Sequence, residues 1–139
     1  MDGPYDLQRF LSAQAPVFEQ VRAELHAGCK RGHWMWFVFP QIAGLGHSAT
    51  AQHFAIASLD EARAYLAHDI LGPRLRECAA LVAQVEGHSI EQIFGSPDDL
   101  KFHSSMTLFA RAAPQEQVFK DALQKYFGGE EDRATVERI

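Results

Sequence analysis

The longest regular pattern in the sequence is a run from Asp69 to Val85, in which apolar residues stand alternately four and three positions apart. These positions are Leu71, Leu75, Cys78, Val82 and Val85. Because an α-helix turns once every ~3.6 residues, all of them share one helix face. The run therefore predicts a long helix that carries Pro73 in its first turn and ends at Gly87.

Helical periodicity and helix-start residues recur along the rest of the chain. Helices are predicted from near Asp6, from Pro16 to Gly28, after the caps Ser58 and Ser89, over Pro97–Ala112 and over Gln115–Phe127. The charged tail from Glu130 forms either one last short helix or a frayed end. Only the segment Trp34–Phe39 could instead form a strand. Because it is continuously apolar, its periodicity does not distinguish a strand from a helix. Because a lone strand would have no partner, the sequence favours an all-α fold.

Length and composition narrow the class of protein. The 139 residues suit one domain with one core, so we expect a compact multihelical bundle over residues 1–139. No apolar run approaches the roughly 20 residues of a membrane span, and the acidic start Met1–Asp6 has no signal-peptide core. Cys29 and Cys78 lack metal or redox spacing, and the net charge of −5 argues against a nucleic-acid partner. These features predict a cytoplasmic protein that keeps its thiols reduced and does not contact membranes.

Four aromatic residues crowd into the six-residue segment Trp34–Phe39. Phe37 and Phe39 are expected in the core, where large apolar residues usually lie. Trp34 and Trp36 stay open between burial and a binding role, because each has an N–H that needs a partner and a flat face for stacking. The polar residues that flank them are Arg31, His33 and Gln41. One segment therefore supplies both core residues and candidate site residues.

A glycine-rich turn, Gly44-Leu-Gly46, follows this segment. Ser48 is predicted to cap a helix that runs from Ala49 to about Ile56. Free N–H groups at a helix start attract anions, which makes Ser48 a candidate binding residue. The other interpretation is a plain tight turn, because a third glycine and a preceding strand are both missing.

A second polar cluster lies on the predicted helix Pro97–Ala112. Lys101, Ser104 and Ser105 fall on neighbouring rows of this helix, at three- and four-residue spacings. Hydroxyl groups are unfavourable inside a helix unless they bond back to a carbonyl one turn earlier or face a pocket. In the pocket alternative, Lys101 supplies charge for an anion and the serines orient it.

Seven histidines raise the question of a metal site. None stands at the spacing from another His or from a Cys that is typical of zinc ligands, so we expect no metal and no cofactor. His33 is the best candidate for a general acid or base, because it stands beside Arg31, Trp34 and Trp36. A Ser-His-Asp triad is not recognisable.

Several motifs together resemble one bacterial family. They are Gly32-His-Trp-Met-Trp-Phe-Val-Phe-Pro-Gln41, Gly44-Leu-Gly46 with Ser48, Leu71-Gly-Pro-Arg-Leu75, and Lys101-Phe102 with Ser104–Phe109. From Asp6 to about Phe127 the chain resembles domain-of-unknown-function family eighteen-ten, which is often mislabelled calpastatin. The composition of this chain does not fit a disordered protease inhibitor. The resemblance implies a mostly α-helical fold and supplies no activity, cofactor or catalytic residue.

The sequence favours one function and leaves others open. We expect a small anionic ligand, nucleotide-like or phosphorylated, in a cleft between residues 30–48 and the helix 97–112. The candidate binding residues are Arg31, Trp34, Trp36, Gln41, Ser48, Lys101, Ser104 and Ser105, with His33 as proton donor or acceptor for any reaction. The alternatives are a protein-interaction module with an exposed Trp/Arg patch, and a hydrolase or transferase that uses His33. In a further alternative the polar clusters only stabilise the fold.

Overall fold

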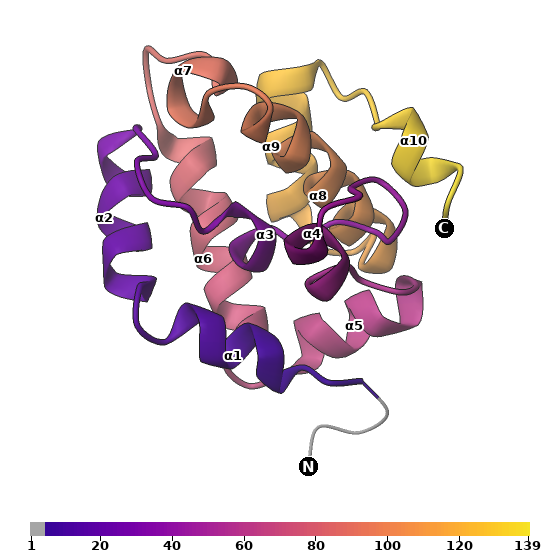
Figure 1. Cartoon of the computed structure of the whole chain (residues 1–139). Coiled ribbons are helices and arrows are strands. Elements are labelled where there is room, and N and C mark those ends of the chain that lie inside the picture. The colour runs from indigo at the N-terminus through magenta and orange to yellow at the C-terminus, as the bar shows by residue number, and fades with distance from the viewer. Residues whose placement is uncertain (1–4) are drawn as a thin grey trace.

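Helix α8 (Asp98–Ala112) packs against α5 (Leu59–Ala67), α7 (Ile90–Phe94), α9 (Gln117–Phe127) and α10 (Arg133–Val136). Its residues 104–110 are all buried. The computed structural model describes residues 5–139, which contain ten helices and no strand (Figure 1). The remaining helices are α1 (Gln8–Gln14), α2 (Phe18–Ala27), α3 (Met35–Val38), α4 (Ala49–His53) and α6 (Leu71–Gln84). The expected all-α single domain is confirmed for these residues. Residues 1–4, which belong to the predicted domain and its acidic start, lie outside them.

Helix starts and stops follow the capping residues of the sequence. The Ser48 and Ser58 hydroxyls accept hydrogen bonds from backbone N–H groups three residues later, at 3.1 and 3.2 Å. Ser89 forms a full capping box with Gln92 at the start of α7. Gly28 ends α2 in the left-handed conformation, with φ of 76°. These predictions are confirmed.

Several predicted helix boundaries are wrong by two or three residues. The long helix predicted over Asp69–Val85, with its end at Gly87, spans Leu71–Gln84, because Val85 is already extended. The second helix begins at Phe18 rather than Pro16, because Val17 has a φ of −125° that lies outside the helical region. Helix α9 begins at Gln117 rather than Gln115, because the preceding Glu116 is extended. The helix predicted to reach Ile56 ends at His53, and Ile56 instead pairs with Ile42 in a parallel bridge.

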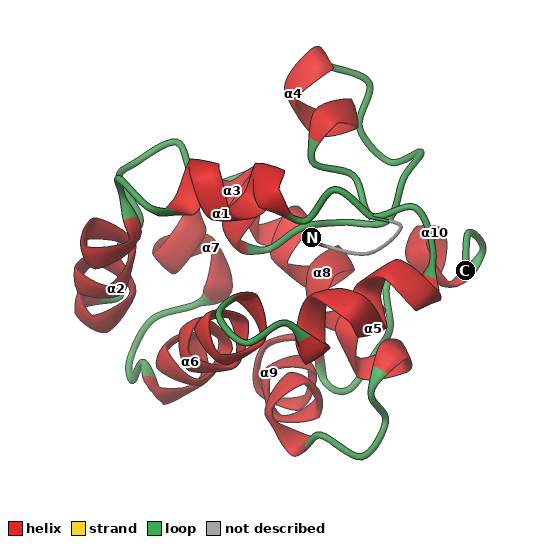
Figure 2. Cartoon of the chain, turned by 90° about the horizontal axis from the view of Figure 1, so that it is seen from below, coloured by secondary structure: helices red, strands yellow, loops and turns green. Residues whose placement is uncertain are grey.

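This bridge closes a projecting segment, residues 43–55, which we call the arm. The bonds at its base run from Ala43 N–H to the Ile56 carbonyl and from Ile56 N–H to the Gln41 carbonyl, both at 2.8 Å. Arg9 donates to the carbonyls of His53 and Ala55 and so fixes the other side of the base. Helix α4, inside the arm, has no buried residue and stands away from the other helices (Figure 2).

The aromatic segment forms the short helix α3, so the strand alternative is wrong. Phe39 is fully buried and its ring meets that of Phe102 with centroids 5.0 Å apart. Phe37 is only half-buried and packs on Phe54, with ring centroids 5.3 Å apart. None of the helices between residues 5 and 139 is long and apolar enough to cross a membrane.

Candidate functional site

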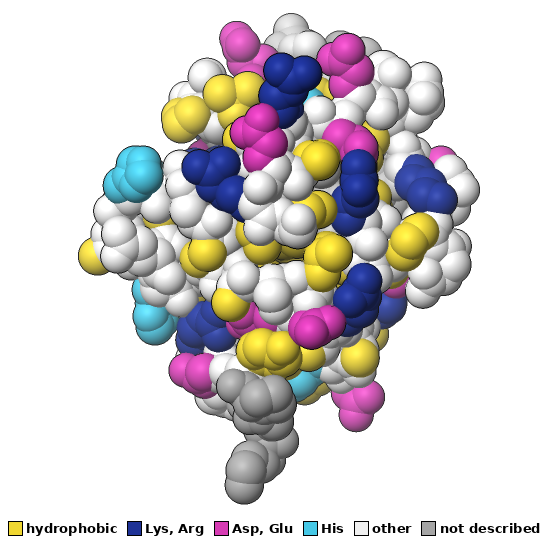
Figure 3. All heavy atoms as spheres, turned by 90° about the vertical axis from the view of Figure 1, so that its right-hand side faces the viewer, with side chains coloured by type: hydrophobic (Ala, Val, Ile, Leu, Met, Phe, Trp, Pro, Cys, Tyr) yellow, Lys and Arg dark blue, Asp and Glu magenta, His cyan; other side chains and the backbone are white. Residues whose placement is uncertain are grey.

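A cleft of about 480 Å³ lies where three distant parts of the chain meet. They are α3 with the following loop, the first half of α8, and the start of α10. The lining includes Trp36, Gln41, Ser48, Lys101, Ser104 and Asp132. Small-molecule sites typically measure roughly 300–1,000 Å³, so the cleft has a suitable size. On the side of the molecule where α5 and α10 lie, hydrophobic side chains reach the surface between basic and acidic ones (Figure 3).

The cleft brings together part of the site predicted from the sequence. The predicted residues that line it are Trp36, Gln41, Ser48, Lys101 and Ser104. Those that do not line it are Arg31, His33, Trp34 and Ser105. The division separates the two tryptophans, which the sequence leaves equivalent.

Lys101 stands between a carboxylate and an aromatic ring. Its ammonium lies 3.1 Å from an oxygen of Asp98 and 4.5 Å from the ring centre of Trp36. Lys30, whose side chain is 8% exposed, lies 2.8 Å from the other oxygen of the same carboxylate. Burial alone would raise the pKa of Asp98, but hydrogen bonds from Lys30 and Lys101 hold that pKa below its usual value. Two lysines therefore share one ionised carboxylate at the wall of the cleft.

Trp34 belongs to the core, because it is 1% exposed and its indole N–H is already bonded. It donates to Glu24 at 2.9 Å, and the N–H groups of Arg31 and Gly32 donate to the same oxygen. Burial alone would raise the pKa of Glu24, but these bonds and one from Gln20 lower it to about 2. Glu24 is not among the site residues predicted from the sequence. Its place on the inward face of α2, three residues after Val21, is the signal that identifies it.

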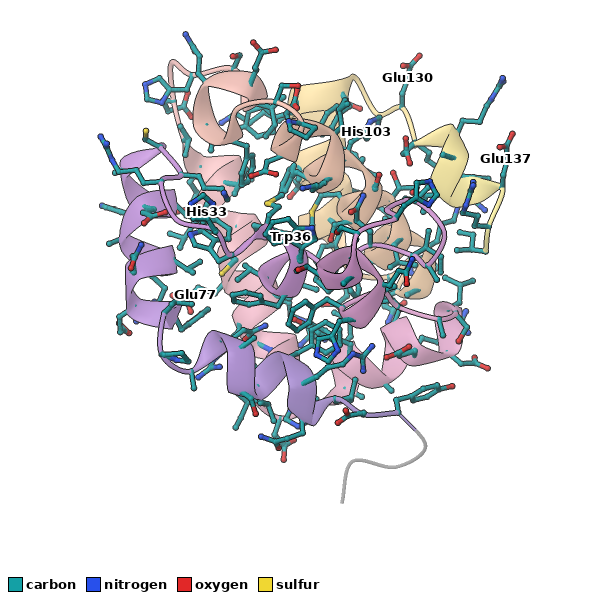
Figure 4. All side chains as sticks on the ribbon, in the orientation of Figure 1. His33, Trp36, Glu77, His103, Glu130 and Glu137 are labelled. Atoms are coloured by element: carbon teal, nitrogen blue, oxygen red, sulfur yellow. The ribbon has the colours of Figure 1, made fainter. Side chains whose placement is uncertain are left out.

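Arg31 and His33 are both exposed. Figure 4 shows His33 on the side of the molecule that carries α2, whereas Trp36 lies near the centre of the view. No group of three His, Cys, Asp or Glu side chains within residues 5–139 is arranged to hold a metal ion. Because His33 does not line the cleft, a proton transfer by His33 in the cleft has no geometric support.

Ser104 connects the cleft to the C-terminal segment. Its hydroxyl is within bonding distance of the Leu100 carbonyl at 3.1 Å, the back-bond expected of a helix serine, and of Asp132 at 3.0 Å. The same Asp132 oxygen accepts from the N–H and hydroxyl of Thr135 and caps α10. The Asp132–Thr135 spacing is a helix-start signal that predicts α10, although it does not predict the contact of α10 with α8. Ser105 is fully buried, and its hydroxyl has no partner among the described residues.

A smaller and more enclosed cavity of about 120 Å³ adjoins the cleft, and we call it the inner cavity. It lies between the arm and α3, and its residues shared with the cleft are Trp36, Gln41, Gly46 and Ala51. Phe54 and Ala55 line only the inner cavity, and none of its lining side chains is charged. A charged compartment and a neutral one thus meet at Trp36 and Gln41.

Comparison with known proteins identifies relatives but no activity. No curated protein matches the chain significantly. The crystal structure of the conserved hypothetical protein Rv1873 from Mycobacterium tuberculosis is similar, with 64% sequence identity over 96% of each chain and a TM-score of 0.95. The family model described as protein of unknown function (DUF1810) matches residues 4–139. The chain therefore belongs to the DUF1810 family.

Proposed function

We propose that the cleft binds a small phosphorylated metabolite, whose anionic group interacts with Lys101. The observation that carries this proposal is the sharing of Asp98 by Lys30 and Lys101. Two ammonium groups face the single carboxylate of Asp98, so this carboxylate neutralises Lys101 only in part. A partly desolvated ammonium that is incompletely neutralised favours an anion over water.

The uncharged polar groups of the cleft suit the same ligand. Ser48 accepts from Ala51 N–H through its oxygen, so its own hydrogen is free to donate to a ligand. The amide of Gln41 has no hydrogen-bond partner among the side-chain contacts of residues 5–139 and lines the same cleft. Both groups can orient a ligand that Lys101 attracts.

Asp132 narrows the ligand class. A carboxylate in the lining repels a ligand of high negative charge and accepts hydrogen bonds from hydroxyl groups. A sugar phosphate combines one anionic group with several hydroxyl donors and therefore fits both Lys101 and Asp132. The free cysteines, Cys29 and Cys78, agree with action in the reducing cytoplasm, which we include in the proposal.

Two other functions receive less support. An interaction module that uses an exposed Trp/Arg patch loses one anchor, because Trp34 is in the core. A hydrolase or transferase that uses His33 needs that side chain within reach of a bound group, and His33 does not line the cleft.

The test is isothermal titration calorimetry with ribose 5-phosphate at low ionic strength. We expect binding that Lys101→Met weakens by about 10–100-fold, the range for one charge-assisted hydrogen bond. Lys120→Met is the matched control, because Lys120 is an exposed lysine of α9 that does not line the cleft. No binding at millimolar ribose 5-phosphate, or equal losses in both variants, would contradict the proposal.

A further inference from the structure

We infer that the inner cavity holds a flat, neutral, single-ring group of the same ligand, so that the ligand class is a pyrimidine nucleotide. This inference rests on the proposed function, because the cleft must first take the sugar phosphate.

The two compartments are adjacent and share a wall. Trp36, Gln41, Gly46 and Ala51 line both of them. A ligand anchored at Lys101 can therefore extend past Trp36 and Gln41 towards the arm. Such a ligand needs one charged end and one uncharged end.

The inner cavity admits only an uncharged group. None of its lining side chains carries a charge, so an ionic group inside it would lack a partner and pay the cost of desolvation. Two backbone N–H groups at the base of the arm are already paired, because Ala43 N–H donates to the Ile56 carbonyl and Ile56 N–H to the Gln41 carbonyl. The side-chain hydrogen-bonding groups in the lining are the Gln52 amide, whose N–H already donates to the His47 carbonyl at 3.1 Å, the Gln41 amide and the Trp36 indole N–H. Neither the Gln41 amide nor the Trp36 indole has a hydrogen-bond partner within residues 5–139.

These two groups match the edge of a nucleobase. The Gln41 amide presents a donor and an acceptor side by side, and the carbonyl and ring N–H of a pyrimidine present the complementary pair. Phe54 supplies an apolar aromatic wall, held by rings of Phe10 and Phe37 with centroids 5.8 and 5.3 Å away. A flat ring between apolar walls with one polar edge satisfied is the usual mode of base recognition.

The size of the inner cavity favours one ring over two. A single water needs ~10–15 Å³ of such space, so about 120 Å³ holds a group of several heavy atoms. The single ring of a pyrimidine therefore suits this space better than the two fused rings of a purine.

The experiment compares calorimetric titrations with ribose 5-phosphate and with uridine 5′-monophosphate. We expect the nucleotide to bind about tenfold more tightly, the value of one or two neutral hydrogen bonds. Ala55→Leu fills only the inner cavity and should remove this gain while leaving the affinity for ribose 5-phosphate within about twofold. Gln41→Leu, of similar volume, should also remove the gain. Ala57→Leu, at an exposed position that lines neither compartment, is the control for folding.

The outcomes separate this inference from the proposed function. Binding of ribose 5-phosphate with no gain for the nucleotide would overturn the inference and leave the proposed function standing. Equal weakening of both ligands by Ala55→Leu would also overturn it. Absence of binding for both ligands would overturn the two together.

Discussion

Glu24 shows how one buried carboxylate organises the loop before the aromatic segment. Its Oε1 accepts from Arg31 N–H at 2.8 Å, Gly32 N–H at 3.0 Å and the Trp34 indole at 2.9 Å. Glu24→Ala would leave these donors without their acceptor, so we expect a loss of about 3 kcal/mol in the free energy of unfolding, measured in urea.

Two variants make the Glu24 test specific. Glu24→Gln keeps one acceptor oxygen and should lose less stability than Glu24→Ala. Glu19→Ala removes an exposed carboxylate of the same helix and should stay within about 0.5 kcal/mol of wild type. A Glu24→Ala protein as stable as the Glu19→Ala protein would refute the anchoring role.

Glu24 also predicts a dependence of stability on pH. Its pKa is lowered from an ordinary 4.5 to about 2, so the folded state binds fewer protons between these values than the unfolded state does. The contribution of Glu24 to stability is complete above about pH 4.5 and is lost as the pH falls towards 2. We therefore expect the stability difference between wild type and Glu24→Gln to narrow over this window in urea titrations. A difference that stays constant from pH 5 to pH ~2 would contradict the assignment.

Single residues mark the limit of what could be predicted from the sequence. Phe39 is in the core because size and apolar character suffice to predict burial. Trp34 and Trp36 are the same residue type in the same segment, so the sequence does not show which of them is in the core. The difference depends on which indole N–H meets a buried acceptor. Trp34 meets Glu24, ten positions earlier in the chain, and Trp36 meets the ammonium of Lys101 on α8. Such pairings are decided by packing between helices, which local sequence does not encode.

Among the helices, the contact between α5 and α6 depends on Gly72. A Cβ added to Gly72, in the first turn of α6, would clash with the carbonyl oxygen of Leu66 near the end of α5. Helix propensity alone favours alanine over glycine by about 1 kcal/mol. Because the clash is with backbone rather than a flexible side chain, we expect Gly72→Ala to destabilise the protein by about 2 kcal/mol in urea unfolding.

The control for Gly72 lies in the same helix. Ala80→Gly, at a half-buried position of α6, should cost about 1 kcal/mol through propensity alone. A gain in stability from Gly72→Ala would show that α5 and α6 can separate slightly, and would remove the close approach as a constraint.

Helix starts marked by a capping serine were predictable, whereas the end of α4 was not. A cap such as Ser89 works within three residues, so the sequence contains the whole cause of the start of α7. The end of α4 depends instead on the pairing of Ile56 with Ile42 and on Arg9, which bonds the carbonyls of His53 and Ala55. These partners are far away in the sequence, and their effect appears only when the chain is folded.

At the scale of the whole molecule, the cleft is an assembly of three segments that meet only in the folded chain. The contact of residues 30–48 with the helix 97–112 is predictable, because both carry polar groups in apolar surroundings. The third segment, around Asp132, was expected only as a short helix or a frayed end. This segment is held against α8 by hydrogen bonds that link Asp132 to Ser104 and Thr107. The charged composition of the segment does not indicate that it packs against another helix.

Asp132 therefore predicts how the C-terminal segment is attached. Its Oδ2 accepts from Ser104 on α8 and from the N–H and hydroxyl of Thr135, at 3.0, 3.1 and 2.6 Å. Asp132→Ala removes both the cap of α10 and one of its links to α8, so residues 133–139 should exchange their amide hydrogens faster. The bond from His103 to the Glu130 carbonyl is left intact, so the urea midpoint of the whole domain should change little.

Hydrogen exchange followed by mass spectrometry measures this effect segment by segment. Glu137→Ala, at an exposed position of the same segment, is the matched control and should leave the exchange of residues 133–139 unchanged. Because Asp132 and Ala134 form one wall of the cleft, Asp132→Ala should also weaken ribose 5-phosphate binding, by about tenfold for a lost hydroxyl partner. Exchange at the wild-type rate in Asp132→Ala would mean that the remaining contacts, among them the bond from the N–H of residue 132 to Thr107, suffice to hold α10 against α8. The Asp132 side chain would then have no role in closing the cleft.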